Sequence, residues 1–203
     1  MTEPSQATIK YWKQCYGTPD LFFRYCETDL LPLFATPTSR YAHFTLDVCA
    51  EPWNAKCANF IAPPGTMEHD GMVGIDGLKT PWETSGAAWC NPGFSKCWPW
   101  ARQARRQCDN GYLSFMLTHA THAADWAQWT IKHASACILI NPRINFDHDT
   151  RLVNWLFRQG KKPTGNNRDS MIWVFDPAYE GPCRFINPEP WLITPRKAKA
   201  KAA

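Results

Sequence analysis

Short apolar runs rich in strand-forming residues alternate with helix-like segments along this chain, and this alternation is the feature that most constrains its fold. We predict strands at residues 43–48, 87–90, 112–117, 136–140 and 170–175. We predict helices at residues 54–61, 98–109 and 123–133. Strands that alternate with helices favour an α/β fold with a mostly parallel sheet and helices on both faces.

The chain has 203 residues, which is enough for one domain with a substantial hydrophobic core. We expect a single domain over residues 1–195 and a basic, disordered tail over residues 196–203. No apolar run approaches the roughly 18 residues that span a bilayer, and Met1–Lys10 contains no apolar signal segment. Without such segments, we expect a cytoplasmic location, reduced thiols and no membrane contact. The nine cysteines include no CxxC pair, so we expect no metal.

Two polar features lie where predicted strands end. Asp47 is close to the end of the first strand, and Asn91-Pro92-Gly93-Phe94 follows the second. In parallel α/β sheets, ligands bind at the carboxyl ends of strands where the strand order reverses. These residues are therefore candidates for a binding site. Asp47 could instead cap a following helix, and Asn-Pro-Gly is also a common turn.

The tetrad that begins at Asn91 suits chemistry on an exocyclic amine. The lone pair of such an amine is delocalised into the ring, so hydrogen-bond acceptors for its two hydrogens make the nitrogen a better nucleophile. The Asn91 side chain and the Pro92 carbonyl can supply two acceptors, and Phe94 can stack on a base turned out of its helix. Gly93 stands where a second proline would stiffen the loop.

The net charge of +4 is mild, and it permits an anionic partner without requiring one. Basic residues nevertheless gather in a predicted helix and in a predicted loop over residues 158–169: Arg102, Arg105 and Arg106, and then Lys161, Lys162 and Arg168. A further basic group lies in the tail. Each group is either a contact surface for a polyanion or a solvated face.

Several short motifs follow one another along the chain: Tyr16–Pro19, Phe44–Ala50, Asn54–Cys57, Asp76–Leu78 with Trp82, Trp89–Ser95, Trp126 and Pro142–Phe146. Their order and spacing, over about residues 10 to 176, resemble the phage Dam-type DNA N6-adenine methyltransferase family. The resemblance implies a Rossmann-like class I methyltransferase sheet. It also implies transfer of a methyl group from S-adenosylmethionine to the N6 amine of adenine in DNA.

The resemblance further implies roles for individual residues. Thr18 and Pro19 would line the methionine end of the cofactor, Asp47 would hold its ammonium group, and Asp76 would lie near its adenine. The target base would be received by Asn91, Pro92 and Phe94. The two basic groups named above would contact DNA. Because little chain is left for a recognition domain, we expect short or relaxed sequence specificity, and a bacterial host cytoplasm if a phage encodes the chain.

This sequence departs from the family pattern at two places. No glycine-rich turn follows Asp47, and Gly93 replaces a proline. Two alternatives therefore stay open. One is a weakly active or inactive protein that binds DNA or cofactor, and the other is a methyltransferase for another amine, such as cytosine N4 or an amine in RNA. A dinucleotide-dependent oxidoreductase is disfavoured because no GxGxxG follows the first strand.

Overall fold

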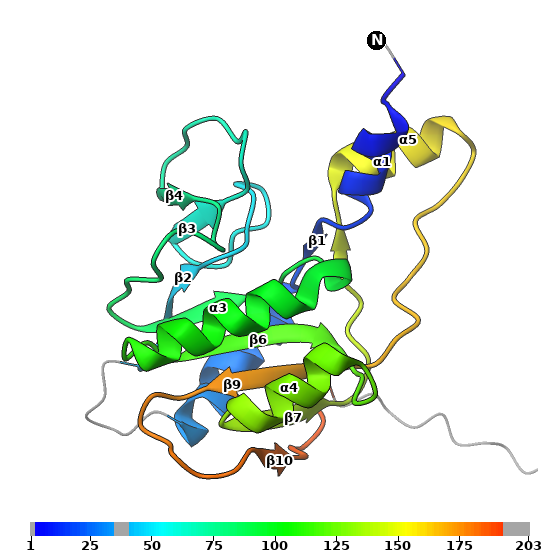
Figure 1. Ribbon diagram of the computed structural model, residues 1–203. Helices are drawn as coiled ribbons and strands as arrows, with labels where there is room; N and C mark the ends of the chain where they lie inside the picture. Colours follow the sequence, from blue (N-terminus) through cyan, green and yellow to red (C-terminus); the bar gives the residue numbers. More distant parts are fainter. Residues whose placement is uncertain (1–2, 35–40, 193–203) are drawn as a thin grey trace, which may run out of the picture.

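The computed structural model describes residues 3–34 and 41–192, and a sheet of eight strands forms the centre of this part (Figure 1). Its strands, in chain order, are β2 Phe44–Asp47, β3 Asn59–Ala62, β4 Met72–Ile75, β5 Ala87–Cys90, β6 Ser114–His119, β7 Ala136–Ile140, β9 Ser170–Phe175 and β10 Arg184–Ile186. Their order in space is β10-β7-β9-β6-β5-β2-β3-β4. Strand β9 runs antiparallel to β6 and β7, and the other neighbours are parallel. The prediction of a mostly parallel, Rossmann-like sheet is confirmed.

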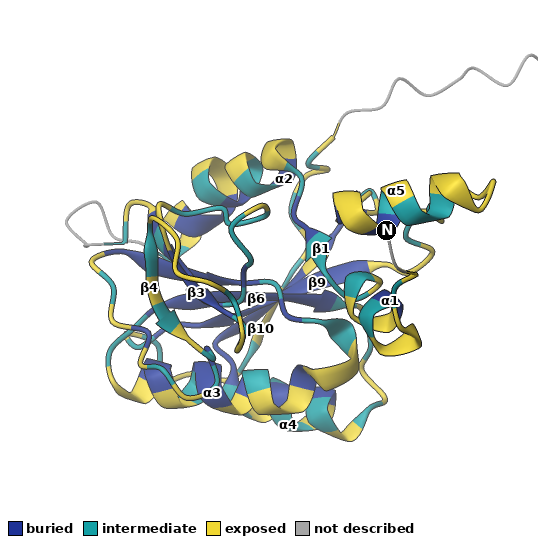
Figure 2. Ribbon diagram, turned by 90° about the horizontal axis from the view of Figure 1, so that it is seen from above, coloured by how far each residue is buried: buried dark blue, intermediate teal, exposed yellow. Residues whose placement is uncertain are grey.

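Helices cover both faces of the sheet, as predicted (Figure 2). On one face lie α2 Asp20–Tyr25 and two short turns, η1 Cys26–Leu30 and η2 Leu31–Leu33. On the other lie α3 Cys97–Asp109 and α4 Asp125–His133. Because side chains alternate along a strand, β6 supplies both cores. Phe115 and Leu117 pack with Phe22 in one core, and Met116 packs with Ala104 in the other.

One predicted element is wrong. Residues 54–61 were expected to form a helix, but the structure has turns there, followed by β3. The Asn54 side chain accepts a hydrogen bond from Glu51 N, and the Asp47 side chain accepts one from Lys56 N. Side chains thus take up backbone N–H groups and compete with the hydrogen bonds of a helix. The neighbouring Phe60 and Ile61 are buried in the sheet instead.

A separate group of elements stands away from the sheet, and we call it the outer lobe (Figure 1). It consists of α1 Gln6–Trp12, β1 Tyr16–Gly17, β8 Asp147–His148 and α5 Thr150–Arg158. β1 and β8 pair antiparallel, with Tyr16 opposite His148. Residues 159–169 then return to β9 without a helix or strand, which confirms the predicted loop.

No helix in the described ranges is long and apolar enough to cross a membrane. All nine cysteines lie within these ranges and none forms a disulfide. The predicted tail at residues 196–203 lies outside the described residues.

Candidate active site

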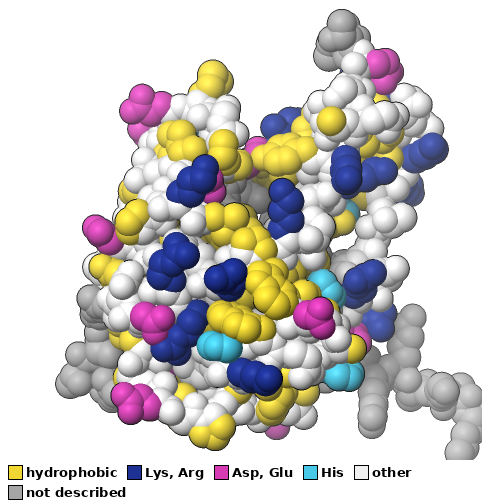
Figure 3. All heavy atoms as spheres, in the orientation of Figure 1, with side chains coloured by type: hydrophobic (Ala, Val, Ile, Leu, Met, Phe, Trp, Pro, Cys, Tyr) yellow, Lys and Arg dark blue, Asp and Glu magenta, His cyan; other side chains and the backbone are white. Residues whose placement is uncertain are grey.

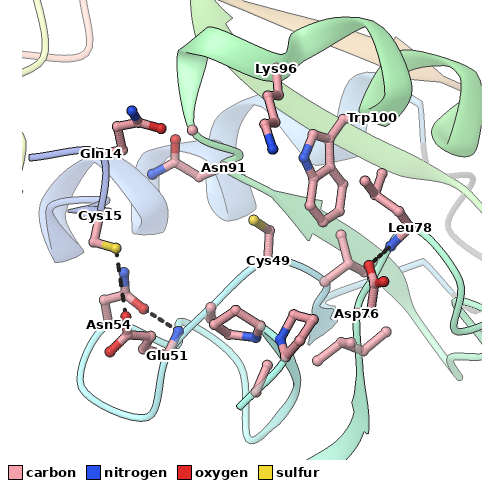
Figure 4. Close-up of a pocket in the computed structure, with 18 of the residues that line it drawn as sticks. Gln14, Cys15, Cys49, Glu51, Asn54, Asp76, Leu78, Asn91, Lys96 and Trp100 are labelled. Carbon is pink, nitrogen blue, oxygen red and sulfur yellow. Dashed lines mark hydrogen bonds between the residues drawn. The ribbon is translucent and has the colours of Figure 1, made fainter. Parts of the chain in front are cut away.

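A cavity of about 430 Å³ opens at the carboxyl edge of the sheet. It lies between the outer lobe and the loops that follow β2, β3 and β4, in the hollow between the two projecting parts of the molecule in Figure 3. Figure 4 labels ten of the residues that line it: Gln14, Cys15, Cys49, Glu51, Asn54, Asp76, Leu78, Asn91, Lys96 and Trp100. Tyr16 and Gly93 also line it. A volume of this size is typical of a small-molecule site.

The strand order reverses at this edge between β2 and β5. After β2 the chain continues to β3 and β4 on one side, and it returns to β5 and β6 on the other. The neighbouring strands bring Asp47 opposite Trp89 in the register, two residues before Asn91. The two sequence candidates, Asp47 and the tetrad, are therefore adjacent at the point where parallel sheets bind ligands.

Asn91 is held in one orientation by the outer lobe. Its Nδ2 donates hydrogen bonds to the carbonyl oxygen of Tyr16 at 3.1 Å and to Oγ1 of Thr18 at 3.2 Å. Since a backbone carbonyl can only accept, the amide nitrogen must face Tyr16. Oδ1 of Asn91 therefore points the other way, and it has no hydrogen-bond partner among the described residues. Asn91 presents a fixed, free acceptor at the cavity wall.

Phe94 joins the tetrad to a cluster of aromatic rings. Its ring centroid lies 6.4 Å from that of Tyr16, in a stacked arrangement, and 5.7 Å from those of His119 and Phe146. The side chain is half-buried, whereas Pro92 is buried. Pro92 and Phe94 do not line the cavity directly, so the structure brings only Asn91 and Gly93 of the tetrad to its wall.

Asp47 lies behind the cavity wall rather than on it. Its carboxylate accepts hydrogen bonds from Cys49 N at 3.3 Å and from Lys56 N at 3.1 Å, so it shapes the loop that lines the cavity. Burial raises the pKa of Asp47 to about 7, although these two hydrogen bonds and the charge of Lys56 act in the opposite direction. The predicted contact between Asp47 and a cofactor ammonium stays a prediction.

The other predicted cofactor residues occupy different places. Asp76 lines the cavity, and its φ of +63° lies in the left-handed region, which costs a non-glycine residue about 1 kcal/mol or more. Its carboxylate accepts a hydrogen bond from Leu78 N and pairs with Lys79. Thr18 is buried against Asn91, and Pro19 directly precedes α2; neither lines the cavity.

Gly93 adopts a conformation that other residues also adopt. Its φ is −56° and its ψ is 124°, and an added Cβ would meet atoms of Gln14 at 3.7–3.8 Å, which is ordinary contact. Its N–H forms a hydrogen bond with the thiol of Cys49. Burial raises the pKa of that thiol, and this hydrogen bond acts in the opposite direction. A proline at this position would suit the φ but would remove the N–H that hydrogen-bonds to Cys49.

The two basic groups do not lie together. Arg102 and Arg106 are exposed on α3, and Arg105 pairs with Asp109 one turn along the same helix. Lys161, Lys162 and Arg168 are exposed in the loop that returns to β9. Arg168 lies near the aromatic cluster, since its charge acts with burial to lower the pKa of His119.

The structure adds a network that the sequence did not indicate. Glu51 accepts hydrogen bonds from Tyr11 at 2.5 Å and from Arg151 at 2.6 Å, and Arg151 also pairs with Asp149. The atoms of Cys15, Glu51 and Asp149 that could bind a metal ion lie within 4.8 Å of one another. Arg151, however, already neutralises the charge of both carboxylates. Tyr11, Glu51 and the pair Asp149 and Arg151 come from three distant parts of the sequence, so no local motif could have linked them.

Comparison with known proteins bears on this geometry. A family model described as DNA N-6-adenine-methyltransferase (Dam) matches residues 9–195. No curated protein and no solved structure gives a significant match. The matched range contains the whole sheet, the outer lobe from Ile9 onward and every residue of the cavity described above. The chain therefore belongs to the Dam family of DNA N-6-adenine-methyltransferases.

Proposed function

We propose that this enzyme transfers a methyl group from S-adenosylmethionine to the N6 amine of adenine in DNA and that Asn91 binds the amine. The observation that carries the proposal is the orientation of the Asn91 amide. Nδ2 is engaged by Tyr16 and Thr18, and Oδ1 is left free to accept a hydrogen bond from the target. An acceptor fixed before the substrate arrives needs no reorganisation during the reaction.

The cavity fits the proposed cofactor by the chemistry of its lining. Trp100 and Leu78 offer apolar surface for an adenine ring, and the Asp76 carboxylate can accept hydrogen bonds from its amine. Lys96 makes no ion pair with any described residue, and it can pair with the carboxylate of a methionine moiety. When bound, S-adenosylmethionine would supply an electrophilic methyl group. We propose that Asp47, Thr18 and Pro19 contribute by shaping the wall around its methionine end.

The residues of the tetrad would act on the target base. Oδ1 of Asn91 and the Pro92 carbonyl accept hydrogen bonds from the two N6 hydrogens, which favours the tetrahedral nitrogen of the transition state. Phe94 stacks on the base and holds it against these acceptors. An amide does not take up the proton that N6 loses after methylation, so this proton leaves with solvent.

DNA would be held by basic residues outside the cavity. Lys161, Lys162 and Arg168 lie in the loop that returns to the carboxyl edge, and Arg102, Arg105 and Arg106 lie along α3. Contacts to phosphate carry no sequence information, so this arrangement supports short or relaxed specificity. We also propose a cytoplasmic location, in a bacterial host if a phage encodes the chain, because no cysteine forms a disulfide.

Transfer of labelled methyl from S-adenosylmethionine to unmethylated DNA, followed by digestion to nucleosides, tests the proposal. We expect N6-methyladenine, and a loss of about 100-fold or more in rate for Asn91→Ala. Asn110→Ala is the matched control, because Asn110 is an exposed residue at the end of α3 and does not line the cavity. A label in N4-methylcytosine, or an Asn91→Ala variant as active as the control, would refute the proposal.

A further inference from the structure

A second cavity, of about 480 Å³, lies beside the outer lobe. The lining combines three lysines with an aromatic ring, a histidine and apolar side chains: Lys13, Tyr16, His148, Leu152, Leu156, Lys161, Lys162, Pro163 and Thr164. The residues come from the end of α1, from β1 and β8, from α5, and from the loop that follows α5. Two stretches that are distant in sequence, residues 13–16 and 148–164, therefore meet around it.

Tyr16 connects this second cavity to the active site. It lines both cavities, its carbonyl oxygen holds the Asn91 amide at 3.1 Å, and its ring stacks on Phe94. The Tyr16 ring also contacts the ring of His148 edge-on, with 5.7 Å between the ring centroids. An occupant of the second cavity would thus be separated by one side chain from the residues that receive the target base.

The lysines of the second cavity are available for a ligand. All three are exposed, and none forms an ion pair with another described residue; the lining contains no acidic side chain. Lys161 is positioned by the end of α5, where Gly160 has a φ of +66° and Lys161 N donates to the Leu156 carbonyl. Three cations around one cavity favour phosphate groups.

The floor of the cavity suits the rest of a nucleotide. Leu152 and Leu156 lie one helical turn apart on α5, and with the Tyr16 ring they give a surface on which a base or sugar can pack. His148 lines the same floor, and its Nδ1 is buried without a hydrogen-bond partner. A buried polar atom of this kind is costly unless a ligand pairs with it.

We propose that the second cavity binds the nucleotide that adjoins the target adenine in the same DNA strand. Lys13, Lys161 and Lys162 pair with its phosphates. Tyr16, with the leucines of α5, packs against its base or sugar, and His148 forms a hydrogen bond with it. The inference rests on the proposed function, and it extends that function by giving the enzyme a contact with the base next to its target.

Salt dependence of DNA binding tests the lysines. Fluorescence anisotropy with a labelled duplex should show that the double variant Lys13→Ala, Lys162→Ala loses about two units from the slope of log K against log salt, because two phosphate contacts are removed. Cofactor affinity measured by calorimetry should be unchanged. The control is Lys10→Ala with Lys132→Ala, which removes the same charge from exposed residues outside both cavities and should keep the slope.

A DNA duplex with an abasic nucleotide tests whether a base packs on the floor of the second cavity. Placed next to the target adenine, on one side, the abasic nucleotide should weaken binding to the wild-type enzyme by on the order of 10-fold, because packing of one base is lost. The abasic nucleotide should cause a smaller loss of affinity in His148→Ala, because this variant has already lost one contact with the base or sugar. If the double lysine variant keeps the wild-type slope, or if the abasic loss is the same on both sides and in His148→Ala, the cavity does not hold this nucleotide.

These outcomes are separable from failure of the proposed function. An enzyme that forms N6-methyladenine but binds DNA independently of these residues would overturn only the second cavity. A wild-type protein that binds DNA with the expected slope but methylates nothing would overturn the proposed function and leave the nucleotide site supported. Absence of any DNA binding would overturn both.

Discussion

β6 and β9 pair over six residues, Ser114–His119 with Ser170–Phe175, whereas β1 and β8 pair over only two, Tyr16–Gly17 with Asp147–His148. The first pair lies in the middle of the sheet, with every residue of β9 buried. The second pair lies in the outer lobe. The two regions meet at the active site, since Asn91 follows a strand of the sheet and is held by Tyr16 and Thr18 at the end of β1.

Different forces hold the two regions. The sheet is stabilised by two apolar cores, one on each face, and such burial contributes roughly 1.5–3 kcal/mol for each large side chain. The outer lobe depends on polar contacts: Arg151 joins α5 to Glu51, lies over the Trp12 ring and pairs with Asp149. The backbone of Asn91 is thus set by the packed core, and its side-chain orientation by a region that we expect to open more readily.

A core substitution in the sheet should have the largest effect on stability. Leu117 is fully buried in β6, and Leu117→Ala should lower the free energy of unfolding by about 2–5 kcal/mol, because it leaves a cavity. Urea denaturation measures this change. The control is Leu139→Ala in the neighbouring β7, where the side chain is 42% exposed. Equal losses in the two variants would mean that burial does not govern the stability of the sheet.

Removal of Arg151 should loosen the outer lobe and leave the sheet intact. Arg151→Ala leaves the buried carboxylate of Asp149 without its charged partner, and we expect the free energy of local unfolding to fall by about 1–3 kcal/mol. Hydrogen exchange should become faster in α1 and α5 but not in β6 or β9. Arg143→Ala, which breaks an exposed pair with Asp169, should change little. Faster exchange throughout the sheet would show that the two regions unfold together.

The same contrast explains what could be predicted from the sequence. Strands β5, β7 and β9 and helices α3 and α4 were predicted because their apolar residues recur locally, and the tetrad was found because it follows such a strand. The sequence did not reveal the anchoring of Asn91 by Tyr16, because 75 residues separate the two. β10 was missed because only three residues form it, and two of them are exposed.

Titration of Asp47 should reveal how the sheet edge responds to pH. The folded pKa of about 7 lies above the ordinary value of 3.8, so the folded state retains a proton that the unfolded state releases. Stability from this group therefore falls as the pH rises from about 4 to about 7, by at most about 1.4 kcal/mol per pH unit, and is constant above that range. Thermal unfolding of wild type and Asp47→Asn between pH 5 and 8 measures it. A constant difference between the two proteins would rule out this titration.

Gly93 lies where the sheet and the outer lobe meet, and replacing it should have the smallest effect. The φ of −56° suits proline, which restricts the unfolded chain and favours folding by about 0.4–1 kcal/mol. Gly93→Pro also removes the N–H that hydrogen-bonds to Cys49, which opposes this gain, so the free energy of unfolding should change by less than about 1 kcal/mol. If looseness of the tetrad limits catalysis, the methylation rate should rise severalfold. Gly93→Ala, which keeps the N–H that faces Cys49, is the control. A Gly93→Pro enzyme with an unchanged rate would mean that the anchored amide of Asn91 already fixes the acceptor.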